Sequence, residues 1–93
     1  MAVYVVTWNL NREVNYNAKR TAFLNNLNGY ENVAEPGLET VRWISTDLSP
    51  EALTDDLIRP LDSNDRLFLT RLTAGSYQGW MNEPTWEWIR RRL

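Results

Sequence analysis

The feature that most constrains this chain is a pair of strand-like segments that are apolar on both faces. Residues 2–10 are rich in β-branched and aromatic side chains, which favour strands, and apolar residues occupy both of their alternating sides. Residues 66–73 repeat the pattern, with leucines on one side and Phe68 and Leu72 on the other. A sheet with one face in water alternates apolar and polar residues, so a sheet that contains these segments is predicted to be covered on both faces.

The segments around these two strands predict the order β-α-β-β-α-β, followed by a tail and a helix. The expected elements are a helix over 17–28, a weak strand over 30–34, a strand over 41–46, a helix from Ser49-Pro50 to about Pro60, a weak pairing over 77–80 and a helix from Pro84. This order is typical of the ferredoxin-like fold, an α+β fold in which two helices cover one face of a four-stranded antiparallel sheet. We expect a single domain over 1–93, with a core at about 2–73 and a C-terminal extension at 74–93. The second face is left to the C-terminal helix or to a second subunit.

Residues at the expected helix ends agree with this division. Asn15 or Asn17 can cap the first helix, and Gly29 is well placed to end it. Ser49 followed by Pro50 is typical of a helix N-terminus, because the hydroxyl accepts a backbone hydrogen bond and proline fits the first helical position.

Composition excludes several classes of protein. Hydrophobic residues make up 43% and charged residues 24%, which is typical of a globular domain, and no apolar run approaches the ~18 residues of a membrane span. The chain has no cysteine and no secretory signal, so we expect a cytoplasmic protein. It also has no histidine, which removes the commonest general base and metal ligand, and no cofactor is expected. A formal net charge of -2 argues against broad electrostatic capture of nucleic acid.

Five Trp, four Tyr and two Phe are many for 93 residues, so the aromatic side chains fill either the core or a subunit interface. Trp43 lies in the middle of a strand and is expected in the core. Trp8, Trp80, Trp86 and Trp88 are ambiguous. Trp86 and Trp88 lie about 200° apart on a helix and cannot face one core. We interpret Trp8, Trp86 and Trp88 as dimer contacts, with base stacking as the alternative.

Two polar clusters are candidates for chemistry. Asp62 and Asp65 belong to an Asp-Ser-Asn-Asp sequence. One interpretation is that these carboxylates bind a metal, and the other is that they form a turn in which they accept hydrogen bonds from nearby amides. Arg90, Arg91 and Arg92 form the only basic run. They contact phosphate or complement the negative end of the last helix.

Two stretches, WISTDLSPEALTDDL (43–57) and LDSNDRLFLTRL (61–72), together with the first strand, resemble a group of small bacterial and phage proteins. These proteins carry the SinR-family label and are related in fold to CRISPR-associated protein 2 and virulence-associated protein D. The resemblance covers roughly 2–92, and 61–72 is its most specific part. It implies a ferredoxin-like homodimer in which the tail after Thr73 packs across the partner, and which acts either as a scaffold that holds DNA or as a nuclease.

The resemblance also implies a metal position. In CRISPR-associated protein 2, an Asp at the end of the first strand binds a divalent cation near the dimer axis, and the matching residue here is Asn9, in VVTWNLN. A neutral amide binds Mg²⁺ far more weakly than a carboxylate does, so Asn9 is either a degenerate ligand or a strand-end residue that bonds backbone. A metal site would need Asp47, Asp62 or Asp65 instead. We therefore expect a non-catalytic scaffold or a module that binds nucleic acid or protein. The alternative is a Mg²⁺- or Mn²⁺-dependent ribonuclease or DNA nuclease of toxin or CRISPR-associated type.

Overall fold

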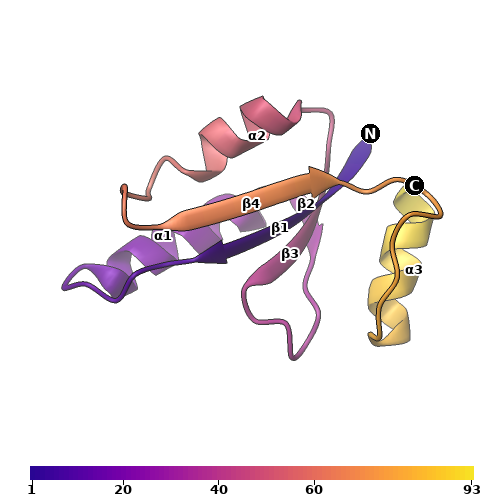
Figure 1. Ribbon diagram of the computed structural model, residues 1–93, viewed down its shortest axis with the longest axis horizontal. Helices are drawn as coiled ribbons and strands as arrows, with labels where there is room; N and C mark the ends of the chain where they lie inside the picture. Colours follow the sequence, from indigo (N-terminus) through magenta and orange to yellow (C-terminus); the bar gives the residue numbers. More distant parts are fainter.

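The computed structural model describes all residues, 1–93, and is an α+β structure with a four-stranded antiparallel sheet and three helices (Figure 1). The strands are β1 (Ala2–Asn9), β2 (Glu31–Val33), β3 (Val41–Thr46) and β4 (Arg66–Arg71). The helices are α1 (Tyr16–Asn28), α2 (Pro50–Leu57) and α3 (Glu83–Arg92). Apart from a few terminal residues and the weak pairing predicted over 77–80, the predicted segments coincide with these elements. None of the three helices has the length and apolar composition that a membrane span needs.

The strands lie in the order β2-β3-β1-β4, with every neighbouring pair antiparallel. The central strand is β1, which pairs with β3 over Ala2–Thr7 and with β4 over Tyr4–Asn9. Each of α1 and α2 connects two strands that have a third strand between them. The edges of the sheet are therefore the short strand β2 and the longer strand β4.

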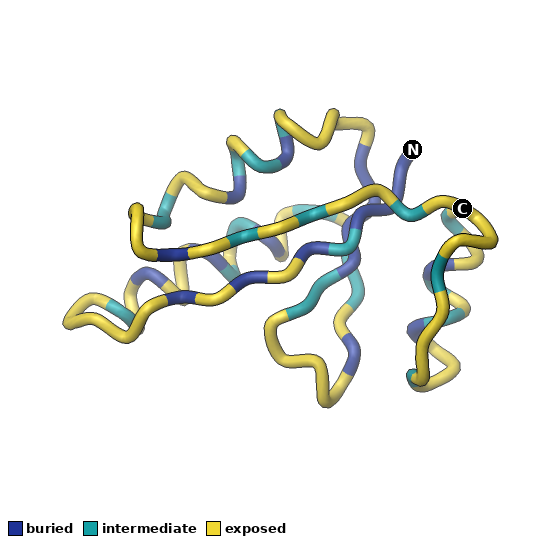
Figure 2. Tube along the Cα trace, viewed as in Figure 1, coloured by how far each residue is buried: buried dark blue, intermediate teal, exposed yellow.

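One face of the sheet packs against α1 and α2 to form the main core. Even-numbered side chains of β1 point to this face, because successive residues of a strand alternate between faces. Figure 2 shows this alternation along β1, whereas β4 is mostly exposed. The core cluster draws on β1, α1, β3 and α2, and its members are Ala2, Tyr4, Val6, Trp8, Leu10, Phe23, Leu27, Ile44, Leu53 and Leu57. Both helices contribute buried apolar side chains to one hydrophobic core, as the sequence predicts.

The opposite face is covered in part by the C-terminal extension. Ile89 of α3 packs against Val3 of β1 and Trp43 of β3, and all three are buried. The sequence allows this face to be covered by the C-terminal helix or by a second subunit. The C-terminal helix of the same chain covers part of it. The resemblance implied a tail that packs across the partner, whereas the tail and α3 lie here against the sheet of their own chain (Figure 1).

A buried carboxylate fixes the start of α3. Glu35, in the loop after β2, accepts hydrogen bonds from Thr85 Oγ1 at 2.6 Å and from the Asn82 backbone N–H at 3.1 Å. A carboxylate at this position satisfies backbone donors at the N-terminus of a helix and complements its positive end. Gly37 in the same loop has a φ of 93°, which glycine adopts without strain.

Three local predictions can be compared with the structure directly. Ser49 caps α2 as expected, because its Oγ accepts from the Ala52 backbone N–H at 3.1 Å. The cap predicted for α1 is wrong, since Asn15 occupies the N-cap position but its side chain makes no capping hydrogen bond. The weak pairing predicted over 77–80 is also wrong, because no strand forms there and Tyr77 packs on α3 instead.

Candidate functional site: an exposed face of the sheet

The first candidate, the acidic turn 62–65, surrounds the chain's single lysine. Lys19 of α1 donates from Nζ to Asp65 at 3.0 Å and to Asp62 at 3.3 Å. The Asp65 carboxylate also accepts from the backbone N–H groups of Asn11 and Asp62. Lys19 and Asp65 are both buried. The turn therefore joins the end of β1, the first turns of α1 and the start of β4.

The pKa shifts in this cluster agree with an ion pair. Burial raises the pKa of the Asp65 carboxyl, but hydrogen bonds from the Asp62 and Asn11 backbone and the Lys19 ammonium outweigh burial, and the net pKa is lowered. The hydrogen bond to Asp65 raises the pKa of Lys19 and outweighs the lowering effect of burial. Both groups are thus held in their charged forms near neutral pH. The backbone hydrogen bonds that Asp62 and Asp65 accept are those that the turn interpretation expects.

The third carboxylate candidate lies elsewhere. Asp47 follows β3 and is 3.7 Å from the N-terminal ammonium, beside the start of β1. Asp62 and Asp65 lie beside the end of the same strand. The structure therefore does not bring the three candidates together, and it contains no group of three or more acidic residues arranged to hold a metal ion.

Asn9 is the last residue of β1 and lies opposite Arg66 of β4. It is exposed and lies on the sheet face away from α1 and α2, because it shares a side of β1 with Val3. Its position at a strand end on an exposed face is compatible with either interpretation that the sequence left open.

The three C-terminal arginines each pair with a glutamate. The pairs are Arg90 with Glu83, Arg91 with Glu87 at 2.9 Å, and Arg92 with Glu31 of β2. The Arg92 guanidinium also lies over the Trp88 ring, 4.2 Å from its centroid. Paired guanidinium groups have less charge to offer to phosphate, and the third pair ties α3 to the edge of the sheet.

The tryptophans predicted as dimer contacts occupy two different environments. Trp8 is only 8% exposed and contacts Phe23 edge-to-face, with ring centroids 5.0 Å apart, inside the main core. Predicting Trp8 as an interface residue was therefore wrong, because α1 already covers it. Trp86 and Trp88 are half-buried at the cluster around Ile89, and Trp86 stacks on Tyr77 with centroids 6.2 Å apart.

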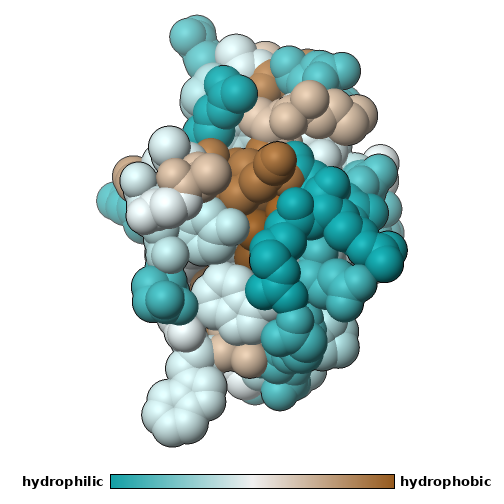
Figure 3. All heavy atoms as spheres, turned by 90° about the vertical axis from the view of Figure 1, so that its right-hand side faces the viewer, coloured by the Kyte–Doolittle hydropathy of each residue, from teal (hydrophilic) through white to brown (hydrophobic).

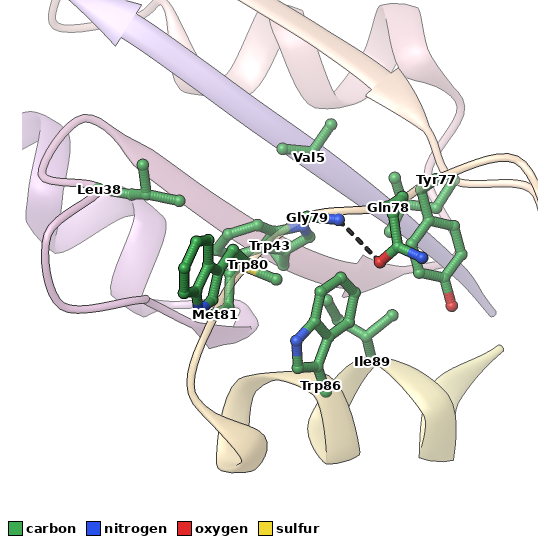
Figure 4. A pocket seen from close by; sticks show the side chains of 11 residues that line it. Val5, Leu38, Trp43, Tyr77, Gln78, Gly79, Trp80, Met81, Trp86 and Ile89 are labelled. Atoms are coloured by element: carbon green, nitrogen blue, oxygen red, sulfur yellow. Dashed lines mark hydrogen bonds between the residues drawn. The ribbon is translucent and has the colours of Figure 1, made fainter.

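A pocket of about 370 Å³ lies between α3, the tail and the sheet. Nine of its eleven lining residues are hydrophobic and none is charged. In Figure 4, Trp86 and Ile89 point from α3 towards Trp43 and Val5 of the sheet, with Trp80 at one end and Tyr77 at the other. Figure 3 shows this side of the molecule, where apolar atoms gather in a hollow bordered by hydrophilic groups.

Beyond this pocket, the sheet surface opposite α1 and α2 is uncovered. We call this surface the open face, and it consists of residues that the strand register places on one side, namely Thr7, Asn9, Val41, Arg66 and Phe68. Phe68 is 65% exposed. At the margin lie Leu38, which is 42% exposed, and Trp80, which is fully exposed at 100%.

The sequence pattern indicated a sheet face that needs a cover, but the residues predicted to contact a partner there were Trp8, Trp86 and Trp88. The apolar pattern on both sides of 66–73 indicated that Phe68 needs a cover, and Trp80 was among the ambiguous tryptophans. Which tryptophan is exposed depends on where the tail runs, and no periodic pattern encodes that path.

Comparisons of this chain with protein-family models, curated proteins and solved structures found no match.

Proposed function

We propose that this chain is a non-catalytic, homodimeric scaffold that functions by binding through the open face. The observation that carries the proposal is that α3 covers only part of the second sheet face. It leaves Phe68 exposed on the β4 side of β1, and it leaves Trp80 exposed at the margin beside Leu38 and Trp43. Large exposed aromatic side chains grouped on one surface mark interaction sites, because their burial in a partner removes much apolar area from water.

The proposal includes a ferredoxin-like fold. It is supported by the strand order β2-β3-β1-β4 and by two helices that each cross over one strand on the same face of the sheet. In this respect the chain resembles the CRISPR-associated protein 2 group. The absence of cysteine fits a reducing compartment, so we place the protein in the cytoplasm.

The arrangement of the carboxylates supports a non-catalytic role. A divalent cation at the turn 62–65 would have to displace the Lys19 ammonium, which already neutralises Asp65. Asp47 lies beside the opposite end of β1, and Asn9 brings no charge. The nuclease alternative requires a metal ion at Asp47, Asp62, Asp65 or the position of Asn9. One cleavage assay therefore tests both functions.

Between nucleic acid and protein as the bound partner, the charges favour protein. The formal net charge is -2, and the basic run at the C-terminus is paired with glutamates. Tight binding of a phosphate backbone requires several unpaired cations along one surface. The open face, with the exposed side chain of Phe68 and with the exposed Trp80 at its margin, fits a protein surface better, and a second copy of the chain is the simplest such partner.

Two measurements test the proposal. Light scattering of the purified protein at micromolar concentration is expected to give twice the chain mass of 10.9 kDa. RNA and DNA substrates incubated with the protein in Mg²⁺, Mn²⁺ or EDTA are expected to stay intact. A monomer would contradict the homodimer, and cleavage that EDTA abolishes and Mn²⁺ restores would contradict the non-catalytic role.

A further inference from the structure

We propose that the pocket between α3, the tail and the sheet binds a small, uncharged aromatic molecule that carries a hydrogen-bond acceptor such as a ring carbonyl. The site lies at the margin of the open face, and the inference does not depend on the homodimer. It rests on the size of the pocket, on the absence of charge in its walls and on an indole N–H that has no partner within the chain.

The size and charge of the pocket set the first limits on the ligand. A volume of about 370 Å³ lies at the lower end of the range for small-molecule sites and suits a molecule of one or two fused rings. None of the eleven lining residues is charged. An ionised ligand would lose hydration there without gaining an ion-pair partner, so the pocket favours an uncharged molecule.

Aromatic side chains form much of the wall. Trp86 of α3 stacks on Tyr77, with their ring planes 20° apart, and Trp43 lies on the sheet side of the pocket. Figure 4 shows Trp80 at the end opposite Tyr77. Aromatic rings attract one another through offset stacking and edge-to-face contact, which an aliphatic ligand cannot use. The walls therefore favour a planar aromatic molecule.

The indole N–H of Trp43 is a buried donor without a partner. Trp43 is only 6% exposed, yet no residue of the chain accepts a hydrogen bond from its Nε1. This nitrogen is not sealed off, because the one fully enclosed and unpartnered side-chain nitrogen or oxygen atom is Nε of Arg42. Trp43 lines the pocket, so its N–H is open to an acceptor bound there. A buried Trp N–H ordinarily has such a partner.

Gln78 supplies a second donor at the Tyr77 end of the pocket. Its Oε1 accepts from the Gly79 backbone N–H at 2.9 Å, which fixes the orientation of the amide (Figure 4). The Nε2 group of the same amide makes no hydrogen bond within the chain. A ligand with a carbonyl oxygen can satisfy either donor, whereas a ligand that only donates satisfies neither.

Three bicyclic probes test this chemistry on the whole chain. Coumarin is uncharged and has a carbonyl acceptor, coumarin-3-carboxylate is its charged counterpart, and indole donates but does not accept. Isothermal titration calorimetry is expected to give saturable coumarin binding with a Kd below about 1 mM. The other two probes are expected to bind about fivefold or more weakly. In proton–nitrogen NMR spectra, the Trp43 indole signal, identified by its loss in Trp43→Phe, should move downfield as coumarin binds.

Four variants locate the binding. Gln78→Leu removes an exposed amide and Trp43→Phe removes the buried N–H, and each is expected to raise the coumarin Kd about threefold to tenfold. Val5→Phe fills the pocket from β1 and should abolish saturable binding. Trp88→Phe is the matched control, because Trp88 lies on α3 but does not line the pocket, and it should bind as the wild type does. Melting temperatures establish which variants fold, and Gln78→Leu keeps the test decisive if Trp43→Phe does not.

Several results would overturn the inference. They are the absence of saturable coumarin binding, equal affinities for coumarin and its carboxylate, and a Trp43 signal that stays in place while Gln78→Leu binds as tightly as the wild type. A coumarin affinity that falls as the protein concentration rises would show that a second copy fills the pocket, which overturns the inference and leaves the proposed homodimer standing. Saturable binding by a monomeric wild type supports the inference and contradicts the homodimer.

Discussion

At the scale of single residues, the buried Lys19–Asp65 ion pair is the contact that holds the acidic turn 62–65 in place. The lysine supplies the positive charge that a cation would supply, and backbone N–H groups occupy the remaining acceptor positions of Asp65. Sequence alone predicted the turn, but it did not predict that Lys19, more than forty positions away, completes the pair. Contacts of this separation depend on the packing of α1 on the sheet and leave no local signal.

The lowered pKa of Asp65 predicts a loss of stability in acid. A carboxyl whose pKa in the folded protein lies below its ordinary value of 3.8 stabilises the fold above that value, and the contribution is lost as pH falls through the folded pKa. We expect the unfolding free energy of the wild type to drop below about pH 4. In Asp65→Asn, the protein should be less stable at neutral pH, and the drop in acid should be shallower.

Denaturant titrations at a series of pH values measure this effect. Asp47→Asn is the control, because the side chain of Asp47 is 80% exposed and only loosely paired with the N-terminus. Equal acid dependence in wild type and Asp65→Asn would show that the buried pair does not set the acid limit.

Asn9 supplies a second test at this scale. If the two copies of residue 9 lie close together in the proposed homodimer, Asn9→Asp adds two neighbouring carboxylates on the open face, and a divalent cation relieves their repulsion. The variant is then expected to gain about 1–3 kcal/mol of stability in excess Mg²⁺ or Mn²⁺, seen as a rise in melting temperature. Asn25→Asp on α1, an exposed site off the open face, should show no such gain. The absence of a gain in Asn9→Asp would place the two copies of residue 9 far apart.

At the scale of elements, the order of strands and helices was predictable because apolar periodicity and caps are local signals. The pattern over 2–10 and the Ser49-Pro50 start of α2 are examples that the structure confirms. The path of the tail was not predictable, because it depends on Glu35 reaching the start of α3 and on Ile89 filling the space between Val3 and Trp43. The sequence also left open whether the chain or a partner covers the second face.

The docking of α3 predicts a large effect of one core substitution. Ile89→Ala removes a fully buried side chain from the cluster with Val3 and Trp43, and it is expected to cost about 2–5 kcal/mol of unfolding free energy. Hydrogen exchange should show the loss of protection concentrated in α3 and the tail. Leu93→Ala, at the exposed end of the chain, is the control and should have little effect. Unchanged stability in Ile89→Ala would mean that α3 is peripheral to the fold.

At the scale of the whole molecule, the chain has one sheet face that its own helices complete and one that they do not. The main core lies under α1 and α2, and the second cluster is small and confined to the α3 side. A domain this short is marginally stable because it buries a limited fraction of its surface. Covering the open face with a partner buries apolar area that the chain itself leaves exposed to water.

The central claim is that the open face is the functional binding surface, and Phe68 tests it most directly. Phe68→Glu replaces the large apolar side chain of the open face with a charge without touching the main core, because the residue is 65% exposed. Sedimentation equilibrium of wild type and Phe68→Glu over a dilution series measures the mass of each. We predict a dimer for the wild type and a folded monomer of 10.9 kDa for the variant. Equal masses for the two proteins, whether monomer or dimer, would contradict the claim.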